Sequence, residues 1–284
     1  MTSIKKVGVV GCGLMGSGIA QVAAEAGYDT RVREIDGERL ANGVASIDRF
    51  LSKGVERGKV TGEQREQTLA RIHPTTDLAD FADVDIVIEA VIEDLEVKRA
   101  VFAELDGVLT SEAIRCSNTS SLCIAEIAAA TAQPQRFAGL HFFSPVPLMA
   151  VVEIIPTLMT SAELTATLTE FGRSLGKTPI LAPDRPGFIV NRLLVPYLLD
   201  AIRALEEGVA TRDDIDTGMT LGCGHPMGPL ELLDFVGLDT TYCIANIMYG
   251  EFREKRFAPP PLLRRMVLAG HLGRKSGRGF YEYD

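Results

Sequence analysis

Two side chains in the middle of the chain could combine a general base with a carboxylate. His141 ends an apolar segment, residues 137–141, that is typical of a buried strand, and Glu153 lies inside a second one, residues 151–155. Because a carboxylate is costly to bury without a partner, we expect the two to pair. The carboxylate would then orient the imidazole, which could take the proton of a substrate hydroxyl as hydride leaves carbon. Taken alone, His141 could equally be a half-buried histidine with a satisfied hydrogen bond.

The other histidines are less suited to catalysis. His73 precedes a proline in a polar stretch and His271 lies among glycines, so both are expected at the surface, whereas the turn around His225 favours a structural hydrogen bond. The five cysteines form no CxxC pair and no zinc-like spacing, so no metal site is expected. Their odd number favours a reduced, cytoplasmic protein, and the chain shows neither a signal peptide nor a membrane span.

A glycine-rich loop near the start of the chain predicts a dinucleotide site. It reads GxGxxG between a strand-like segment and a helical one, with glycines suited to a tight turn, to approach of a pyrophosphate and to close helix packing. Glu34 lies 18 residues after the last glycine and could accept both ribose hydroxyls of an adenosine, which favours NAD over NADP; Arg33 beside it leaves NADP open. The expected cofactor-binding residues of the loop are Gly11, Gly13, Leu14, Met15 and Gly16.

The elements that must position these residues form an α/β pattern. Strand and helix patterns alternate over the first two thirds of the chain, and from Phe188 onward only helical periodicity remains. We therefore predict a Rossmann-type, doubly wound, mostly parallel sheet in residues 1–187 and an all-helical domain in residues 188–284, with the active site between them. Strands are expected at 7–10, 30–33, 85–89, 114–117, 137–141, 151–155 and 178–181. Helices are expected at 15–26, 38–58, 95–109 and 162–175, with a further helical pattern between residue 58 and about residue 71.

Composition and charge exclude some classes of protein. The chain has 284 residues, 46% of them hydrophobic, and a formal net charge of −9. That composition describes a globular protein with a sizeable core. The acidic balance, without a block of lysines and arginines, argues against a nucleic-acid partner.

Several motifs together resemble those of one enzyme family. The sequence resembles the 3-hydroxyacyl-CoA dehydrogenases, most closely the short bacterial 3-hydroxybutyryl-CoA dehydrogenases, over essentially its whole length. The resemblance implies an NAD-dependent oxidoreductase that interconverts a short 3-hydroxyacyl-CoA and the 3-ketoacyl-CoA. It is carried by residues 9–21, 117–122, 139–145, 186–192, 225–230 and 272–281.

The resemblance also implies roles for individual residues. His141 would be the catalytic base with Glu153 as its orienting partner, and Ser120 and Asn191 would hold the substrate, Asn191 from the helical domain. On the cofactor side the resemblance implies Glu93, Lys98, Asn118, Ser120 and Ser144. Without it, Lys98 could be a solvated charge, and Ser120 and Asn191 could be helix caps. Ser144 stands where the family commonly has asparagine.

Three cations match the segment that meets the 3′-phosphate of CoA in the family: Lys53, Arg57 and Lys59. On sequence alone they are equally well explained as a solvated helix face. The segment is interrupted by Gly54 and Glu56, so two other substrates stay open: a hydroxyacyl group on an acyl carrier protein and a free 3-hydroxy acid. A dinucleotide-binding protein without catalysis is disfavoured by the intact site residues. The apolar run at residues 193–199, together with the resemblance, predicts a homodimer through the helical domain.

Overall fold

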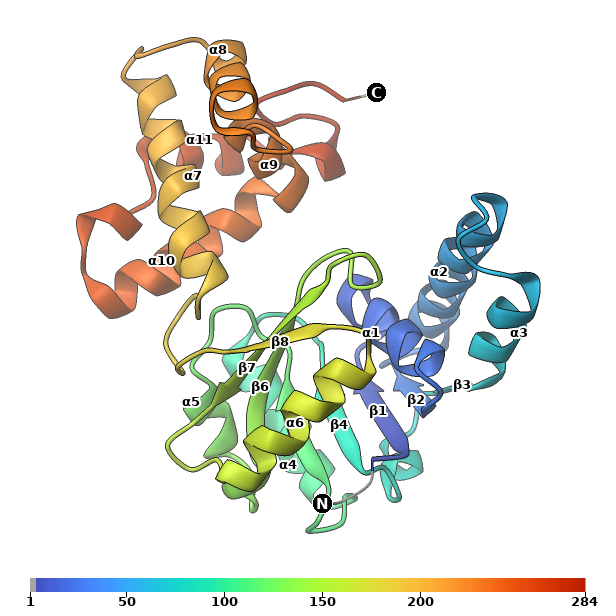
Figure 1. Cartoon of the computed structure of the whole chain (residues 1–284). Helices are drawn as coiled ribbons and strands as arrows, with labels where there is room; N and C mark the ends of the chain where they lie inside the picture. Colours follow the sequence, from blue (N-terminus) through green and yellow to red (C-terminus); the bar gives the residue numbers. More distant parts are fainter. Residues whose placement is uncertain (1–3, 284) are drawn as a thin grey trace. The chain divides into compact units, whose positions relative to one another are not determined.

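The protein consists of two compact units. Its structure is a computed structural model that describes residues 4–283, and the chain divides between Asp184 and Arg185 (Figure 1). Sequence patterns place the change from mixed to helical structure three residues later, after residue 187. The two units are described separately below.

The first unit is built on one eight-stranded sheet in the order β3-β2-β1-β4-β5-β6-β7-β8. All neighbouring strands are parallel except β6 and β7, which are antiparallel. The predicted Rossmann-type, mostly parallel sheet is confirmed, and the seven predicted strands are all present. The strands are β1 (Lys6–Val10), β2 (Asp29–Arg33), β3 (Ile72–Thr75), β4 (Ile86–Glu89), β5 (Ile114–Ser117), β6 (Phe137–Phe142), β7 (Val151–Pro156) and β8 (Thr178–Leu181).

Four of the six helices described for this unit begin at a residue whose side chain caps them. A side-chain oxygen of Asp36, Thr61, Asp94 or Ser161 accepts a backbone N–H at the start of α2, α3, α4 and α6. By contrast, α1 begins after Gly13, with no side-chain cap, which leaves its first N–H groups available to a ligand. The helices are α1 (Leu14–Glu25), α2 (Gly37–Glu56), α3 (Gly62–Ala70), α4 (Leu95–Asp106), α5 (Ile124–Ala128) and α6 (Ala162–Ser174), with short 3₁₀ turns η1 (Leu78–Phe81) and η2 (Pro134–Arg136).

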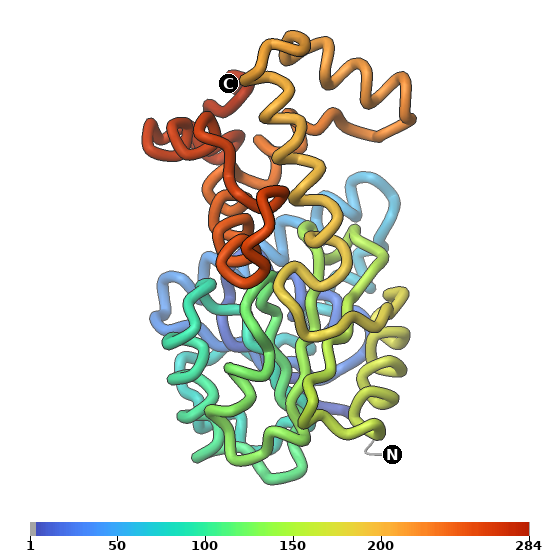
Figure 2. Tube along the Cα trace, turned by 90° about the vertical axis from the view of Figure 1, so that its left-hand side faces the viewer, coloured from blue at the N-terminus to red at the C-terminus, as the bar shows by residue number. Residues whose placement is uncertain are grey.

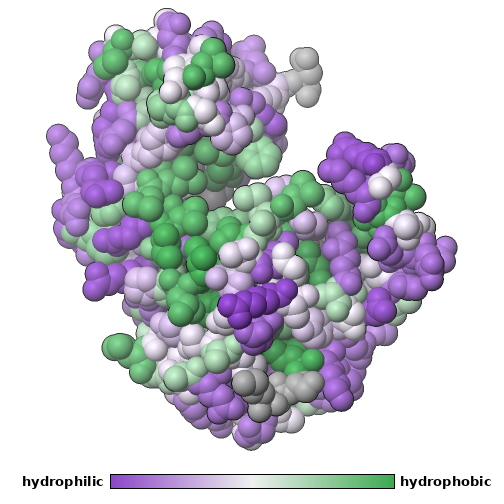
Figure 3. Space-filling view, in the orientation of Figure 1, coloured by the Kyte–Doolittle hydropathy of each residue, from purple (hydrophilic) through white to green (hydrophobic). Residues whose placement is uncertain are grey.

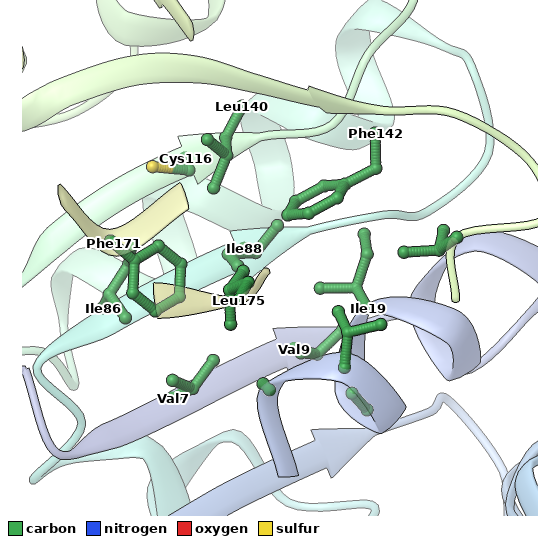
Figure 4. Packing of buried hydrophobic residues seen from close by; sticks show 14 of the residues in the cluster. Val7, Val9, Ile19, Ile86, Ile88, Cys116, Leu140, Phe142, Phe171 and Leu175 are labelled. Atoms are coloured by element: carbon green, nitrogen blue, oxygen red, sulfur yellow. The ribbon is translucent and has the colours of Figure 1, made fainter. Parts of the chain in front are cut away.

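Apolar side chains on both faces hold the sheet in place. On one face, side chains of β1, β4 and β6 pack against α1 and α6, which lie in front of the sheet in Figure 1; Figure 4 shows Val9, Ile19 and Phe142 in this core. On the other face, Phe102 of α4 meets Phe137 of β6 edge to face, with ring centroids 4.6 Å apart. A sheet covered on both faces has strands that read as continuous apolar runs, which is why most of them were predictable.

Two elements of the first unit were not predicted. The β3 strand contains His73 and Pro74, which are unusual in a strand, but it lies at the edge of the sheet, where a missing N–H is tolerated. The α5 helix has only five residues. Its first N–H groups, those of Ile124 and Ala125, are bound by the Asp184 carboxylate 60 residues away, a contact that no local pattern announces.

The second unit is mainly helical and folds back on itself (Figure 2). The tail of this unit, residues 277–283, is not helical. Arg278 forms β-bridges with Gly273 and Glu282, and the Asp234 carboxylate accepts hydrogen bonds from the N–H groups of Phe280 and Tyr281 at 2.8 Å each. The predicted helical domain is confirmed, with a non-helical stretch at residues 277–283. The helices are α7 (Val190–Glu206), α8 (Arg212–Thr217), α9 (Pro229–Val236), α10 (Leu238–Phe252) and α11 (Pro261–Leu268), with short turns η3 (Gly218–Gly222), η4 (Lys255–Phe257) and η5 (Arg274–Ser276).

Most of the apolar run in α7 is used inside the second unit. Val195, Leu198 and Leu199 are buried in its core, and Leu193 alone of the run is exposed, by 66%. None of the helices within residues 4–283 has the length and apolar character that a membrane span requires.

Candidate active site

The glycine-rich loop connects β1 to α1, and its three glycines meet different constraints. Gly11 has φ +98°, and a Cβ there would lie 2.6 Å from the Ala90 carbonyl oxygen. At Gly16 a Cβ would lie 1.7 Å from the carbonyl oxygen of Gly11, so the helix can approach the strand only without a side chain. A Cβ at Gly13 would meet no protein atom within 4 Å. The first and third glycines are therefore required by the fold, and the space over Gly13 is open to a ligand.

Glu34 lies beside this loop and closes one end of a groove. Its carboxylate accepts hydrogen bonds from the backbone N–H groups of Cys12 (2.9 Å) and Ile35 (2.8 Å), which fix its position. Together with Gly13 and Arg39 it lines a cavity of about 310 Å³. The neighbouring Arg33 directs its guanidinium elsewhere, to the Thr76 carbonyl at 3.4 Å. An uncapped helix start, an open glycine and a fixed carboxylate fit the pyrophosphate and adenosine ribose of a dinucleotide.

His141 and Glu153 form the expected pair. They face each other directly in the antiparallel register of β6 and β7, and the imidazole Nδ1 lies 2.6 Å from Glu153 Oε2. Both side chains are buried, Glu153 completely. Because an ionised carboxylate can only accept, the Nδ1 proton lies in this bond when Glu153 is ionised.

The loop after β5 brings further polar groups to the same edge of the sheet. Ser117 at the end of β5 pairs in register with Gly139 of β6, so Ser120 and His141 both follow at the carboxyl ends of neighbouring parallel strands. Asn118 ties the two together, because its Oδ1 accepts the Phe142 N–H at 2.9 Å. The described side-chain contact of Asn118 is thus to β6, and its part in holding the cofactor stays a prediction.

Glu93 holds the turn that contains Ser120. Its Oε1 accepts hydrogen bonds from the Ser120 N–H at 3.0 Å and hydroxyl at 3.2 Å, and from the hydroxyls of Thr119 and Ser121 at 2.6 and 3.0 Å. Its Oε2 lies 3.4 Å from the Lys98 ammonium. Burial works against ionisation, but the ammonium and the hydrogen bonds outweigh it, so the pKa of Glu93 lies below its usual range. Glu93 is therefore an anion that positions Ser120.

Behind Glu93 lies a buried carboxylate that the sequence analysis missed. Glu89, the last residue of β4, is fully buried, and its Oε1 lies 2.7 Å from the ammonium of Lys98, itself only 1% exposed. Its oxygens also accept the Ser117 hydroxyl at 2.6 Å and the Val91 N–H at 2.7 Å. Removing one partner of such a buried pair costs about 3–5 kcal/mol. The signal that identified Glu153, a carboxylate in an apolar strand-like segment, applies equally to Glu89 at the end of β4.

Two family models cover nearly the whole chain. The NAD binding domain of 3-hydroxyacyl-CoA dehydrogenase matches residues 6–185, and the C-terminal domain of the same family matches residues 187–283. The chain belongs to the 3-hydroxyacyl-CoA dehydrogenase family. It is accordingly an oxidoreductase, and its cofactor is NAD, as the sequence predicted.

Individual members of the 3-hydroxyacyl-CoA dehydrogenase family are similar over their full lengths. The chain is 52% identical to the 3-hydroxybutyryl-CoA dehydrogenase of Mycobacterium tuberculosis over 283 residues, which covers 99% of each chain. The crystal structure of M. tuberculosis FadB2 has a TM-score of 0.98 at 52% identity and covers 99% of this chain and 100% of that one. The (S)-3-hydroxybutyryl-CoA dehydrogenase PaaH1 of Ralstonia eutropha has a TM-score of 0.95 at 43% identity, with coverage of 99% and 100%.

Two further residues predicted for this 3-hydroxyacyl-CoA dehydrogenase, Ser144 and Asn191, belong to different units. Ser144 is exposed on the loop between β6 and β7, and the nearly buried Lys177 holds that loop through the carbonyls of Val146 (2.7 Å) and Met149 (2.9 Å). Burial lowers the pKa of Lys177, although Glu25 acts in the opposite direction. Asn191 is half-buried in the first turn of α7, in the second unit.

The three cations expected to meet CoA are exposed at the far end of α2. Lys53 lies in its last turn, Arg57 is its C-cap residue and Lys59 follows, and within residues 4–283 none of them forms a salt bridge. Hydrophilic side chains cover this part of the surface over α2 and α3 (Figure 3). Cations at a helix C-terminus also offset the helix dipole, so their placement alone does not require a ligand.

Proposed function

We propose that this protein is an NAD-dependent dehydrogenase that interconverts 3-hydroxybutyryl-CoA and acetoacetyl-CoA. The observation that carries the proposal is the buried His141–Glu153 pair at the carboxyl edge of the sheet whose first loop forms the dinucleotide site. The substrate is suggested by relatives named 3-hydroxybutyryl-CoA dehydrogenase, including the one that is 52% identical.

In this proposal, His141 exchanges a proton with the substrate, and Glu153 orients the imidazole of His141 for that exchange. During oxidation the C3 hydroxyl gives its proton to His141 Nε2 as the C3–H bond breaks, and the electron pair left on oxygen completes the ketone. When bound, NAD accepts the hydride from C3. The Glu153 carboxylate stabilises the imidazolium that forms and holds the ring in one orientation. Reduction follows the same path in reverse.

The substrate would be held by short polar side chains and by cations at a distance from the reacting carbon. Ser120, whose backbone N–H is held by Glu93, would turn its hydroxyl from Glu93 to donate a hydrogen bond to the substrate oxygen, and Asn191 is the residue proposed from the second unit. Lys53, Arg57 and Lys59 would bind the 3′-phosphate of CoA, with Ser144 and Asn118 on the cofactor side. In a protein of net charge −9, such binding must come from local cations rather than from an overall field.

Assembly and compartment complete the proposal. Large apolar side chains remain exposed on the second unit, which supports a homodimer through it; they include Leu193, Val209, Leu221 and Leu268. No cysteine within residues 4–283 forms a disulfide, which supports a reducing compartment such as the cytoplasm.

Substitution of His141 tests the proposed chemistry. We expect His141→Ala to lower kcat for acetoacetyl-CoA reduction by at least about 100-fold, the scale of a lost general acid or base, and to leave the Kd for NADH nearly unchanged. The matched control is His73→Ala, which removes an exposed histidine at the edge of the sheet, paired with Asp29, and should keep the wild-type kcat. A His141→Ala enzyme with wild-type kcat would exclude His141 from the reaction.

A further inference from the structure

Three charged side chains lie in a row behind the Ser120 turn. Lys98 Nζ lies 2.7 Å from Glu89 Oε1 on one side and 3.4 Å from Glu93 Oε2 on the other. Glu89 and Lys98 are almost completely inaccessible to water, whereas the Glu93 side chain is 29% exposed. Two carboxylates and one ammonium leave a net charge of −1. We call Glu89, Lys98 and Glu93 the charge row.

The donors around Glu89 suit a negative charge there. Its two oxygens receive hydrogen bonds from the Lys98 ammonium, the Ser117 hydroxyl and the Val91 N–H, and an ionised carboxylate can only accept. An ion pair that served the fold alone could be replaced by apolar side chains at little cost, since burying two charges largely cancels their attraction. The position of this pair, at the carboxyl edge of β4 and in contact with Glu93, points instead to a use at the site.

The sheet order places the nicotinamide half of the cofactor on the side of the charge row. The adenosine ribose is assigned to Glu34 after β2 and the pyrophosphate to the loop after β1. The next strands in the sheet are β4 and β5. A dinucleotide that crosses the sheet in this direction brings its second half over the ends of β4 and β5, where Glu93 and Ser120 lie. This step rests on the proposed function, because it assumes NAD in its usual orientation.

The nicotinamide ring carries a positive charge in NAD⁺ and none in NADH. We infer that Glu89 is a positioning residue that holds the Lys98 ammonium and keeps the charge row at −1, so that the site binds NAD⁺ better, relative to NADH, than it would without this carboxylate. Without the Glu89 carboxylate the net charge of the charge row is zero. The row then no longer favours NAD⁺ over NADH. The protein thereby influences the balance between oxidation and reduction through a residue remote from the substrate.

Binding of the two cofactor forms to the full-length protein, without substrate, tests this inference. Calorimetry gives the Kd of NAD⁺, and NADH fluorescence gives the Kd of NADH. We expect Glu89→Gln to raise the ratio Kd(NAD⁺)/Kd(NADH) about five-fold, the scale of one unit charge acting at short range through an effective dielectric well above that of dry protein. Lys98→Met makes the row −2 and should lower the ratio by a similar factor. The double variant restores −1 and should return the ratio to within about two-fold of wild type.

A matched control removes the same charge elsewhere. Glu104→Gln changes an exposed carboxylate on the same helix as Lys98, and the ratio should not change. An unchanged ratio in Glu89→Gln, or a shift in the same direction in both single variants, would show that Glu89 serves the fold alone.

Folding of each variant is checked by circular dichroism. If Glu89→Gln does not fold, the double variant, which leaves no unpaired ammonium, carries the test, and a ratio more than about two-fold from wild type overturns the inference. The proposed function is judged separately by turnover of acetoacetyl-CoA. Turnover with an unchanged ratio refutes the role of Glu89 alone, and a shifted ratio without turnover refutes the substrate alone.

Discussion

At the scale of single residues, carboxylates at the carboxyl edge of the sheet hold other side chains of the proposed site. Glu153 orients His141, and Glu93 holds the backbone and hydroxyl of Ser120. A carboxylate fixed by several donors does not reorganise during a reaction, so the geometry that it imposes on its neighbours is ready before the substrate arrives. The chemistry proposed for this edge of the sheet therefore depends on anions that need not contact the substrate themselves.

Cys12 is predicted to be chemically inert despite its place in the cofactor loop. Burial, with the nearby Glu34 carboxylate adding to it, raises the pKa of its thiol to about 11. At pH 8 only about one such thiol in a thousand is ionised, and the thiolate is the reactive form. Iodoacetamide at pH 8, followed by peptide mass spectrometry, should modify the exposed Cys223 and leave Cys12 intact. Equal labelling of both in the folded protein would contradict this account, and unfolding in urea should expose both.

The contacts of some of these residues could be predicted from the sequence, and those of others could not. Glu153 could be found because a carboxylate inside an apolar strand demands a partner and because few histidines were available to supply one. The contacts of Glu93 and Lys98 could not be derived from the residues, since Lys98 on a helix reads as a solvated charge until the fold buries it. The resemblance to the family supplied their place near the cofactor, and the structure supplied the hydrogen bonds.

At the scale of elements, different glycines of the loop between β1 and α1 serve the fold and the proposed ligand. We expect Gly13→Ala to leave stability within about 0.5 kcal/mol of wild type, because its Cβ meets no protein atom, and to weaken NADH binding at least about ten-fold. Gly16→Ala should instead lower the free energy of unfolding by about 1–3 kcal/mol or more, because its Cβ overlaps the Gly11 carbonyl.

Urea denaturation and NADH titration of the same preparations measure both effects. Gly62→Ala, at the open first position of α3, is the control and should change neither quantity. The account would be wrong if Gly13→Ala destabilised the protein as much as Gly16→Ala, or if it bound NADH as tightly as wild type.

Elements with a strong periodic pattern were predictable, and those fixed by distant contacts were not. The buried strand β5 and the edge strand β8 have the predicted bounds, and α6 ends within one residue of its prediction. The β3 strand is defined by pairing with β2 at the sheet edge rather than by its own residues. The tail of the second unit is held by Asp234, 46 residues before Phe280. The structure of the tail could therefore not be predicted from its local sequence.

At the scale of the whole molecule, the second unit is expected to form a homodimer. Packing within the unit accounts for most of the apolar run in α7, so the argument now rests on the exposed Leu193 and similar side chains elsewhere on this unit. Sedimentation equilibrium should give twice the chain mass of 30.7 kDa, and Leu193→Glu should shift the protein towards the monomer, whereas Leu158→Glu, on the first unit, should not. A wild-type protein that sediments as a monomer at micromolar concentration would refute the dimer.

The choice of substrate belongs to the scale of the whole molecule, because two distant parts of the protein would contact the substrate. His141 would act at the reacting carbon, and the cations at the far end of α2 would bind the CoA phosphate. The sequence and the family favour a CoA thioester, and the interrupted cation segment is the reason to include other acyl carriers in the test.

The most direct test is the oxidation of NADH, followed by its absorbance, with acetoacetyl-CoA, an acetoacetyl carrier protein and free acetoacetate offered in turn at equal concentration. Our account predicts the highest kcat/KM with acetoacetyl-CoA, and a higher KM for it, with little change in kcat, when Lys53 is replaced by Glu. Turnover of the carrier-bound or free substrate alone, or of none of the three, would contradict it.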